Sequence, residues 1–294
     1  MTPINAFLSP CRHKFPFLLL CLFFSTALLA KQPYVLYNAK GKKSSFRKMI
    51  KSLKDKEIIL FGESHNNPIA HWLEIETTKA LYSPNLVLGA EMFEADNQHV
   101  LNDYLSSTID AEGLDTNARL WSNYKTDYAP LLNFAKEHNV LFIATNIPRV
   151  YATKVYKGGF ESLHADSLSE EERSWMAPMP IPFDPFLPRY QNILTMMGDH
   201  GTPELVKAQA IKDATMAHFI LKNFSLGKQF LHFNGCYHSD YYEGILWYLQ
   251  KEHQEYDYAT VSTVVQNDIS QLNKEFLGKA DFIICIDEDV TTSY

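Results

Sequence analysis

Short apolar runs that alternate with helical patterns are the feature that most constrains the fold of this chain. Six such runs occupy residues 57–61, 85–93, 139–146, 229–233, 258–265 and 281–286. They lack the polar alternation of a half-exposed strand, which favours strands that are covered on both faces. We therefore predict an α/β fold with a largely parallel central sheet, flanked by helices that connect the strands through right-handed crossovers.

Two predicted helices have recognisable first residues. Asn67 and Thr202 are good N-cap residues, and each precedes a proline that suits the first helical position. After Asn67, residues recur at helical spacing at Ile69, Trp72, Leu73, Glu76 and Ala80. After Thr202, a stripe runs through Val206, Gln209, Ala210, Asp213, Met216, Ala217, Ile220 and Phe224. Gln209 and Asp213 are its polar members, so they need buried partners, either a ligand histidine that they orient or loop backbone that they fasten.

The alternation of strands and helices lapses between residues 157 and 201. Within it, residues 175–200 read "WMAPMPIPFDPFLPRYQNILTMMGDH" and contain five prolines among large hydrophobic residues. This composition predicts an apolar, Pro-rich insertion over the sheet and not a solvated linker. Two interpretations stay open, a lid that contacts a ligand and an irregular hydrophobic cover for the core.

Residues 1–30 are predicted to be a secretory signal peptide. Arg12 and Lys14 precede an apolar run at 15–30 that is short for a membrane span and ends in small residues. An uncleaved anchor is the alternative, whereas a lipid anchor is not expected because Cys21 lies inside the run. Residues 31–294 are then expected to form a single domain, periplasmic or secreted and without stable membrane insertion, because no later run reaches eighteen apolar residues.

The net charge limits the possible binding partners, and the cysteine content limits the possible disulfides. Without Arg12 and Lys14 the chain would carry 25 basic and 34 acidic residues, a net charge of −9, which disfavours nucleic-acid binding. Cys236 and Cys285 would remain. In an oxidising compartment they are expected either to form a disulfide or to stay as two separate thiols.

Two segments place a histidine at the same point after a predicted strand. "DKEIILFGESH" (55–65) and "GKQFLHFNGCYH" (227–238) each contain a lysine, an apolar run and then Gly-x-x-His, which ends at His65 and His238. Loops that follow parallel strands share one edge of the sheet. We therefore expect the two histidines to converge, although 173 positions separate them.

Two other predicted strands deliver polar side chains to the same edge. Glu91 ends the apolar run "LVLGAEMF", and Asn146 and Arg149 follow "VLFIAT". Glycines at 62 and 235 would allow a sharp turn or a close approach to a ligand. The predicted site lies at this edge and consists of Glu63, His65, Glu91, Arg149 and His238.

These residue types support two chemical schemes. In one, His65, Glu91 and His238 bind a divalent metal such as zinc, manganese or iron and leave positions open for water or substrate. In the other, His65 acts as a general base beside Glu63 or Glu91. Arg149 would stabilise an anion in either scheme, or would only tie down its loop. His71 and five further histidines are interpreted as surface or helix residues, and His200 is left undecided.

Five segments in order resemble the ChaN-like family of haem-binding proteins, which belongs to a superfamily with the Tiki/TraB proteases and the erythromycin esterases. The segments are "EIILFGESHNNP", "LGAEMFEADNQHVLNDYL", "TNIPRVYATKVYKGG", "AQAIKDATMA" and "NGCYHSDYYEGILWYL". The resemblance spans residues 34–247, and its specificity lies in the order of the segments.

The resemblance implies an α/β fold with a site at one sheet edge, and haem or iron acquisition outside the cytoplasm. Tiki-type relatives imply a catalytic divalent metal held by His65, Glu91 and His238, and esterase-type relatives imply catalytic roles for His65 and Glu63. The family's haem-ligating tyrosine does not align with any one of the sixteen tyrosines here. A lipidation site, common in the family, is missing from its usual position.

The leading hypothesis is an extracytoplasmic protein that binds haem or iron for uptake, with a small-molecule ligand and either a monomeric or a homodimeric state. A metal-dependent hydrolase, esterase-like or protease-like, is the alternative. The third hypothesis is a scaffold that has kept the fold and lost the chemistry.

Overall fold

The sheet predicted from the apolar runs is present in the computed structural model, which describes residues 31–164, 167–196, 198 and 201–293. Its strands are β1 (Tyr34–Asn38), β2 (Ile58–Glu63), β3 (Leu86–Glu94), β4 (Leu141–Asn146), β5 (Gln229–Gly235), β6 (Tyr258–Gln266) and β7 (Phe282–Asp287). Across the described residues they form one seven-stranded sheet in the order β1-β7-β6-β2-β5-β3-β4. β1 pairs antiparallel with β7, and all other neighbours are parallel, so the predicted fold class is confirmed.

Each of the six predicted runs overlaps one strand, and the ends of run and strand differ by at most two residues. β4 begins late because Asn139 ends the preceding helix in the left-handed region, at φ 53°. β1 was not predicted. It is a five-residue edge strand, and only its antiparallel pairing with β7, about 250 positions away, defines it.

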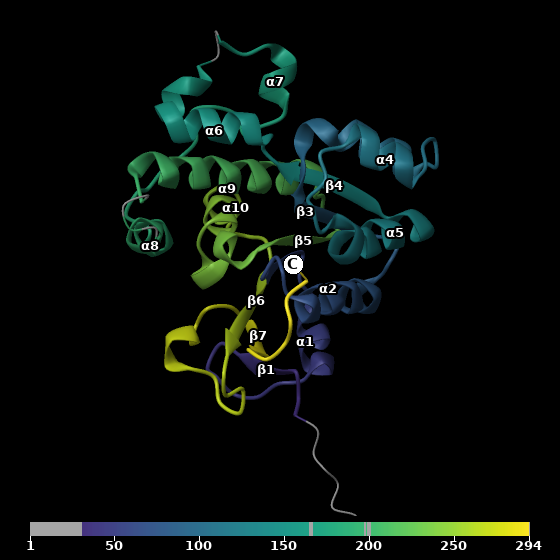
Figure 1. The fold of residues 1–294 in the computed structure, drawn as a ribbon, viewed down its shortest axis with the longest axis vertical. Coiled ribbons are helices and arrows are strands. Elements are labelled where there is room, and N and C mark those ends of the chain that lie inside the picture. The colour runs from purple at the N-terminus through teal and green to yellow at the C-terminus, as the bar shows by residue number, and fades with distance from the viewer. Residues whose placement is uncertain (1–30, 165–166, 197, 199–200, 294) are drawn as a thin grey trace, which may run out of the picture. The chain divides into compact units, whose positions relative to one another are not determined.

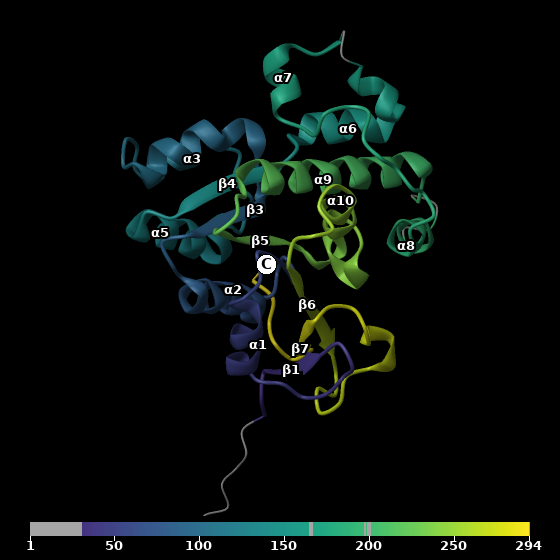
Figure 2. The same cartoon turned by 180° about the vertical axis from the view of Figure 1, so that it is seen from behind.

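Helices cover both faces of the sheet (Figures 1 and 2). Along β2, Ile59 and Phe61 pack on one face while Ile58 and Leu60 pack on the other, as the two-residue period of a strand requires. The first face is covered by α1 (Phe46–Leu53), α2 (Pro68–Leu81), α3 (Gln98–Leu105) and α5 (Ala129–His138), and the short α4 (Ala111–Asn117) packs against α3. The second face is covered by α6 (Arg149–Gly158), α9 (Pro203–Asn223) and α10 (Ile245–Glu252).

Both predicted helix starts are confirmed. The side chain of Asn67 accepts hydrogen bonds from the backbone N–H groups of Ile69 and Ala70, at 3.0 and 3.2 Å, and so caps α2. Thr202 caps α9 by accepting from Leu205 N at 3.1 Å. The apolar stripe predicted for α9 is also buried, apart from Gln209, which is half-buried.

The residues that recur at helical spacing after Asn67 lie on a helix, as predicted, but they do not mark its buried face. Trp72 is 49% exposed, and the buried face is rotated toward residues that are partly polar. The buried residues of α2 are Ala70, His71, Leu73, Glu74, Thr77, Thr78 and Leu81. The apolar pattern failed here because this face packs against polar partners, which are described below.

The Pro-rich insertion forms a cover over α9. It contains α8 (Pro188–Met196) and follows the short α7 (Glu170–Ser174). Its residues Met176, Tyr190 and Ile193 are buried in the same core cluster as α9. The backbone N–H of Ala177 donates to the α9 hydroxyl of Thr215, at 3.2 Å. Because the insertion packs on this helix, it covers the sheet only indirectly.

The predicted signal peptide, residues 1–30, lies outside the described residues, and so does His200. The chain from Gln32 onward forms one compact unit, while the predicted cleavage after residue 30 stays a prediction. Throughout the described ranges, every helix is too short or too polar to cross a bilayer. Cys236 and Cys285 are both free thiols in this structure.

Candidate functional site

The strand order explains how distant residues reach one site. β5 lies between β2 and β3 and is parallel to both, so the ends of three strands that are far apart in sequence are adjacent. Glu63, the last residue of β2, pairs with Gly235, the last residue of β5. The loops that carry His65 and His238 therefore leave the same edge of the sheet from two neighbouring strands.

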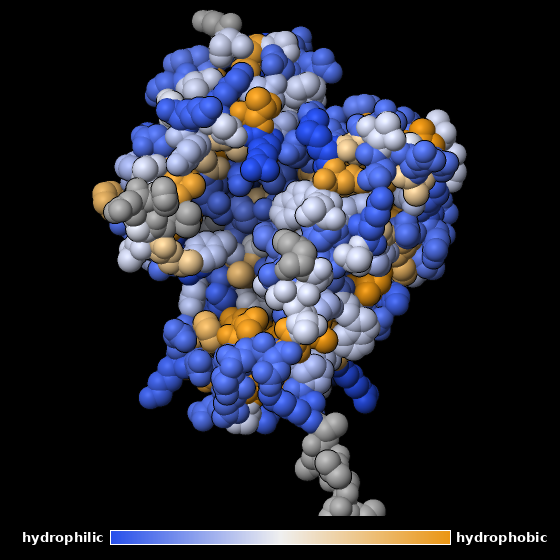
Figure 3. Space-filling view, viewed as in Figure 1, coloured by the Kyte–Doolittle hydropathy of each residue, from blue (hydrophilic) through white to orange (hydrophobic). Residues whose placement is uncertain are grey.

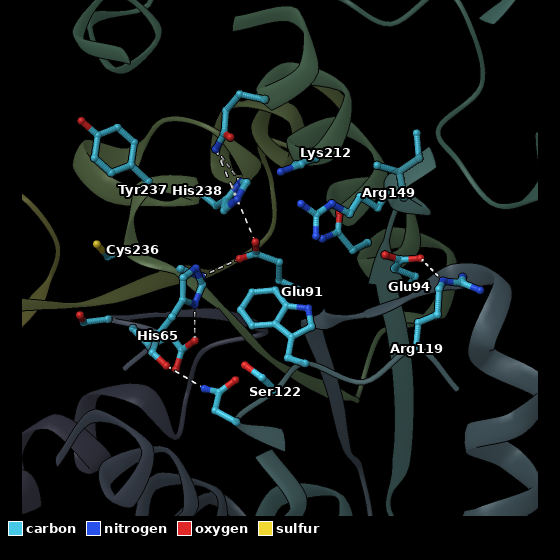
Figure 4. A pocket seen from close by; sticks show the side chains of 18 of the residues that line it. His65, Glu91, Glu94, Arg119, Ser122, Arg149, Lys212, Cys236, Tyr237 and His238 are labelled. Carbon is cyan, nitrogen blue, oxygen red and sulfur yellow. Dashed lines mark hydrogen bonds and ion pairs between the residues drawn. The ribbon is translucent and has the colours of Figure 1, made fainter. Parts of the chain in front are cut away.

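A cavity of about 970 Å³ opens at this edge. Figure 3 shows that this face is hollowed between the side that contains α6 and α8 and the side that contains α4. The side chains of all five predicted site residues line the cavity: Glu63, His65, Glu91, Arg149 and His238. The structure thus brings together side chains from the end of β2 and the loop after it, from β3, from the turn after β5 and from the start of α6 (Figure 4).

His65 and Glu63 form a hydrogen-bonded pair. His65 Nδ1 lies 2.7 Å from Glu63 Oε1, which also accepts a hydrogen bond from the hydroxyl of Tyr128 at 2.8 Å. Burial would lower the pKa of His65, but the hydrogen bond to Glu63 and the charges of Glu91 and Glu63 outweigh it, so the pKa is raised. Because Glu63 holds Nδ1, the remaining nitrogen, Nε2, is the one that can take up a proton or bind a metal.

His238 is held on both sides by carboxylates. Its Nδ1 lies 2.5 Å from Asp213 Oδ1, and its Nε2 lies 3.1 Å from Glu91 Oε1. Burial would lower the pKa of His238, but Glu91 and Asp213 together raise the pKa to about 10. For Glu91, burial acts in the opposite direction and would raise the pKa. The charge of His238 nevertheless holds the pKa of Glu91 far below its usual range. Both nitrogens of His238 therefore have carboxylate partners, which favour the charged form of the imidazole.

Gln209 and Asp213, singled out for their places on the stripe of α9, both contact His238. Gln209 Nε2 lies 2.9 Å from His238 Nδ1, and Tyr190 donates to the second oxygen of Asp213 at 2.9 Å. Of the two roles left open for these residues, orienting a histidine is the one that the contacts support. Whether that histidine binds a ligand stays a prediction.

The two glycines are needed for close approach and not for a turn. A Cβ on Gly235 would lie 2.6 Å from the His65 ring, and a Cβ on Gly62 would lie 2.9 Å from the backbone of Cys236. The ring of His65 thus packs directly over the end of β5. A larger residue at 235 would displace it.

The sequence missed His71, which was interpreted as a surface or helix residue and is in fact 6% exposed. Its Nδ1 lies 2.8 Å from Glu63 Oε2 and 3.4 Å from Glu74 Oε2. Burial would lower the pKa of His71, but Glu63 and Glu74 raise it to about 11. Burial and the charge of Glu63 raise the pKa of Glu74 to about 8. A signal existed, since His71 and Glu74 are three residues apart and must share a face of α2.

The rest of the cavity lining includes apolar and cationic side chains beside neutral polar ones. Leu120 and Trp121 precede α5, whereas Ile193 and Leu205 come from α8 and α9. Arg149 and Lys212 point toward the cavity from α6 and α9 (Figure 4). Arg119 also lines the cavity, but its guanidinium is paired with Glu94 and Asp96.

The side chains that lie close enough together to hold a metal ion differ from the predicted metal ligands. Over the described residues, the group of three or more His, Cys, Asp or Glu side chains whose ligand atoms lie within 4.8 Å of one another is Glu63, His71 and Glu74. His65, Glu91 and His238 do not form such a group. Asp213 and Glu91 contact the two nitrogens of His238, and the metal role predicted for this histidine stays a prediction.

Fold and site together define an α/β protein with a cavity of histidines and carboxylates at the carboxyl edge of a parallel sheet. The chain belongs to the family of haem-binding uptake proteins of the Tiki superfamily, ChaN, whose family model matches residues 49–249. The resemblance noted from the sequence is thereby confirmed.

Individual proteins show the same likeness. The fold is similar to that of ChaN of Campylobacter jejuni, solved with cofacially bound haem, at 19% identity over 86% of this chain and 97% of that chain, with a TM-score of 0.65. It is also similar to a protein from Bacillus cereus, at 12% identity over 86% and 94% of the two chains, with a TM-score of 0.51.

A chloroplast protein, Reticulata-related 5 of Arabidopsis thaliana, is 26% identical over 202 residues, which is 62% of this chain. The match spans only about a quarter, 26%, of that protein's length.

Proposed function

We propose that this protein binds haem in the cavity at the carboxyl edge of the sheet and serves haem or iron uptake outside the cytoplasm. The observation that carries the proposal is the combination of family membership with a large cavity that has both apolar and cationic side chains in its lining. Haem is a flat apolar ring with two carboxylates, so it needs both kinds of surface.

The cavity fits haem in size and in chemistry. Its volume of about 970 Å³ is at the upper end of ordinary ligand pockets. Trp121, Ile193 and Leu205 are part of the lining and offer apolar surface to a porphyrin ring. Arg149 and Lys212 are the cations that would contact its propionates.

Two side chains at the cavity offer an axial donor to the iron. His65 presents Nε2, since Glu63 holds its Nδ1 at 2.7 Å, and a histidine anchored through its second nitrogen is a common metal ligand. Tyr237 also lines the cavity, and its hydroxyl contacts Asn192 and Met196 of α8. Both residue types ligate haem iron in proteins.

A hemin titration tests the proposal. We expect a saturable shift of the Soret band in the purified protein, and a changed band position or a weaker affinity in His65→Ala or Tyr237→Phe, whichever residue is the donor. His99→Ala is the matched control because His99 is exposed and lies outside the cavity lining. The absence of saturable binding in both monomer and dimer would defeat the proposal.

The location outside the cytoplasm rests on the apolar run at residues 15–30 with its basic flank. Cell fractionation followed by N-terminal sequencing of the mature protein tests it. We expect the protein outside the inner membrane with a new N-terminus near Lys31. Recovery in the cytoplasm with residues 1–30 attached would contradict it.

A second candidate function is hydrolysis, and the Glu63–His65 pair is the observation that favours it. A buried carboxylate that orients an imidazole toward a cavity is the arrangement of a general base, and Arg149 could stabilise an anionic substrate group. In the metal-dependent form of this hypothesis, a divalent ion bound at the same edge would supply an activated water.

The hydrolase hypothesis is tested by assaying the purified protein, with and without added Zn²⁺, against esters that carry a carboxylate or phosphate. We expect His65→Gln to reduce any turnover by about a hundredfold or more. If turnover is undetectable under all conditions, or is unchanged in this variant, the hypothesis is wrong.

A further inference from the structure

We propose that Glu63, His71 and Glu74 form a second site, which shares Glu63 with the cavity and binds one divalent transition-metal ion such as Zn²⁺ or Mn²⁺. The inference does not depend on haem binding. It concerns the side of Glu63 that faces α2, whereas the other carboxylate oxygen of Glu63 faces His65.

The three ligands come from two rigid elements. His71 and Glu74 are three residues apart on α2, so they present their side chains on one face of the helix. Glu63 is the last residue of β2, which lies in the middle of the sheet. One ligand atom from each residue lies within 4.8 Å of the other two, and the residues are 1%, 6% and 0% exposed for Glu63, His71 and Glu74.

Two oxygens of this cluster are buried without a hydrogen bond. Across the residues that the structure describes, Glu63 Oε2 and Glu74 Oε1 have no hydrogen-bond partner. Glu63 Oε2 points at His71 Nδ1 from 2.8 Å, which is an ion-pair contact without hydrogen-bond geometry. Buried carboxylate oxygens normally have partners, because leaving them bare is costly. A metal ion between the three side chains would supply the missing partner.

His71 is oriented as a metal ligand is expected to be. Its Nε2 lies 3.1 Å from the backbone oxygen of His65 and 3.4 Å from Asp127 Oδ2, so this nitrogen carries a proton and donates it. Nδ1 therefore faces the two glutamates, with its own proton in the position that a metal would take. A histidine whose second nitrogen donates to a carbonyl or a carboxylate is the usual arrangement at protein metal sites.

The charge of the cluster also favours a cation. Glu63, Glu74 and Asp127 are three buried carboxylates around His71. Within the described part of the chain, the ion pairs formed by Glu63 and Glu74 are with histidines alone. Buried carboxylates need compensation by protons or by cations. One imidazole and two carboxylates form a mixed nitrogen and oxygen set, which suits Zn²⁺, Mn²⁺ or Fe²⁺.

The experiment titrates Zn²⁺ into the purified, chelator-treated full chain by isothermal calorimetry. We expect one equivalent to bind, with an affinity at least tenfold weaker in Glu74→Gln, which removes one ligand charge and keeps the side-chain shape. Glu76→Gln is the matched control, because Glu76 lies on the solvent side of the same helix and pairs with Lys79. It should bind Zn²⁺ as the unmodified chain does.

His238→Gln distinguishes this site from the set His65, Glu91 and His238. It should retain Zn²⁺ binding if Glu63, His71 and Glu74 are the ligands. Loss of Zn²⁺ binding in His238→Gln with retention in Glu74→Gln would overturn the proposal. The absence of saturable Zn²⁺ binding by the unmodified chain would also overturn it, since protons would then balance the negative charge of the cluster.

Two further measurements guard against misfolding of the variants. His71→Gln provides a second disruption of the same site, and far-ultraviolet circular dichroism reports whether each variant is folded. Zn²⁺ should also raise the Tm of the unmodified chain and of Glu76→Gln, but not that of Glu74→Gln. Hemin is titrated separately into the metal-free protein. Absence of Zn²⁺ binding and absence of haem binding are therefore distinguished from each other.

Discussion

Replacing Glu91 by Gln should destabilise the protein in a way that depends on pH. Glu91 Oε1 forms a buried ion pair with His238 Nε2 at 3.1 Å, and Oε2 accepts a hydrogen bond from Gly235 N at 2.7 Å. Glutamine keeps an acceptor for Gly235 and removes the charge. The experiment therefore isolates the electrostatic part of the contact.

The magnitude follows from the pKa of His238. Its rise from 6.5 to about 10 corresponds to about 5 kcal/mol of preferential binding of the charged form. Glu91 is the largest favourable contributor and Asp213 is the next, so we assign Glu91 about 2 to 3 kcal/mol. With a urea m-value of about 2 to 3 kcal/mol per M, the unfolding midpoint should fall by about 1 M near pH 6.

The sign of the pH dependence is fixed by the direction of the shift. Because the pKa of His238 is raised in the folded state, its stabilisation is complete below the unfolded value of 6.5 and is lost as the pH rises toward 10. The lowered pKa of Glu91 contributes stability above 4.5, but the charge of His238 is its main cause, so this contribution is lost over the same range as the pH rises toward 10. The difference between the unmodified chain and Glu91→Gln should thus shrink to about 1 kcal/mol near pH 10.

Urea unfolding, monitored by circular dichroism at pH 6 and pH 10, measures this difference in the free energy of unfolding. Glu94→Gln is the control, because Glu94 also lies on β3 but pairs with the half-exposed Arg119, and it should cost less than about 1 kcal/mol. An equal loss of stability for Glu91→Gln at the two pH values, or no loss near pH 6, would refute the electrostatic argument.

Three other predictions concern single positions. Gly235→Ala should displace the His65 ring, since its Cβ would lie 2.6 Å away, and should weaken hemin binding about tenfold with the fold retained, as a Soret titration would show. Asn67→Ala removes the cap of α2 and should lower the free energy of unfolding by about 1 kcal/mol in urea. Burial and the charge of Asp240 raise the pKa of Cys236 to about 12, so iodoacetamide should alkylate Cys236 slowly in the folded protein near pH 8 and rapidly in urea, as mass spectrometry can follow.

Local patterns were enough for most of the elements. Apolar runs of five to nine residues located six strands, because buried parallel strands are apolar on both faces whatever surrounds them. Asn67 and Thr202 marked two helix starts, because capping depends on residues within one turn. Polar residues at the ends of these runs were expected to share an edge, and the cavity contains them.

The same patterns failed where burial depends on distant partners. His71 has the sequence environment of an ordinary helix residue, yet it is buried because Tyr128 and Asp127 pack against it from more than fifty positions away. The helical spacing of apolar residues did not locate the buried face of α2 for the same reason, since this face meets polar groups and carries histidine, glutamate and threonine. Periodicity of hydrophobic residues cannot report such a face.

The sequence by itself determined which residues would stand at the ends of strands and what chemistry they bring, because those features are fixed by short-range sterics, capping and apolar periodicity. Only the tertiary structure decided their neighbours. β5 lies between β2 and β3, which places His238 beside both His65 and Glu91, and it is this order that builds the cavity. Strand order is set by the packing of the whole sheet and its helices, a sum of long-range contacts that no single segment encodes.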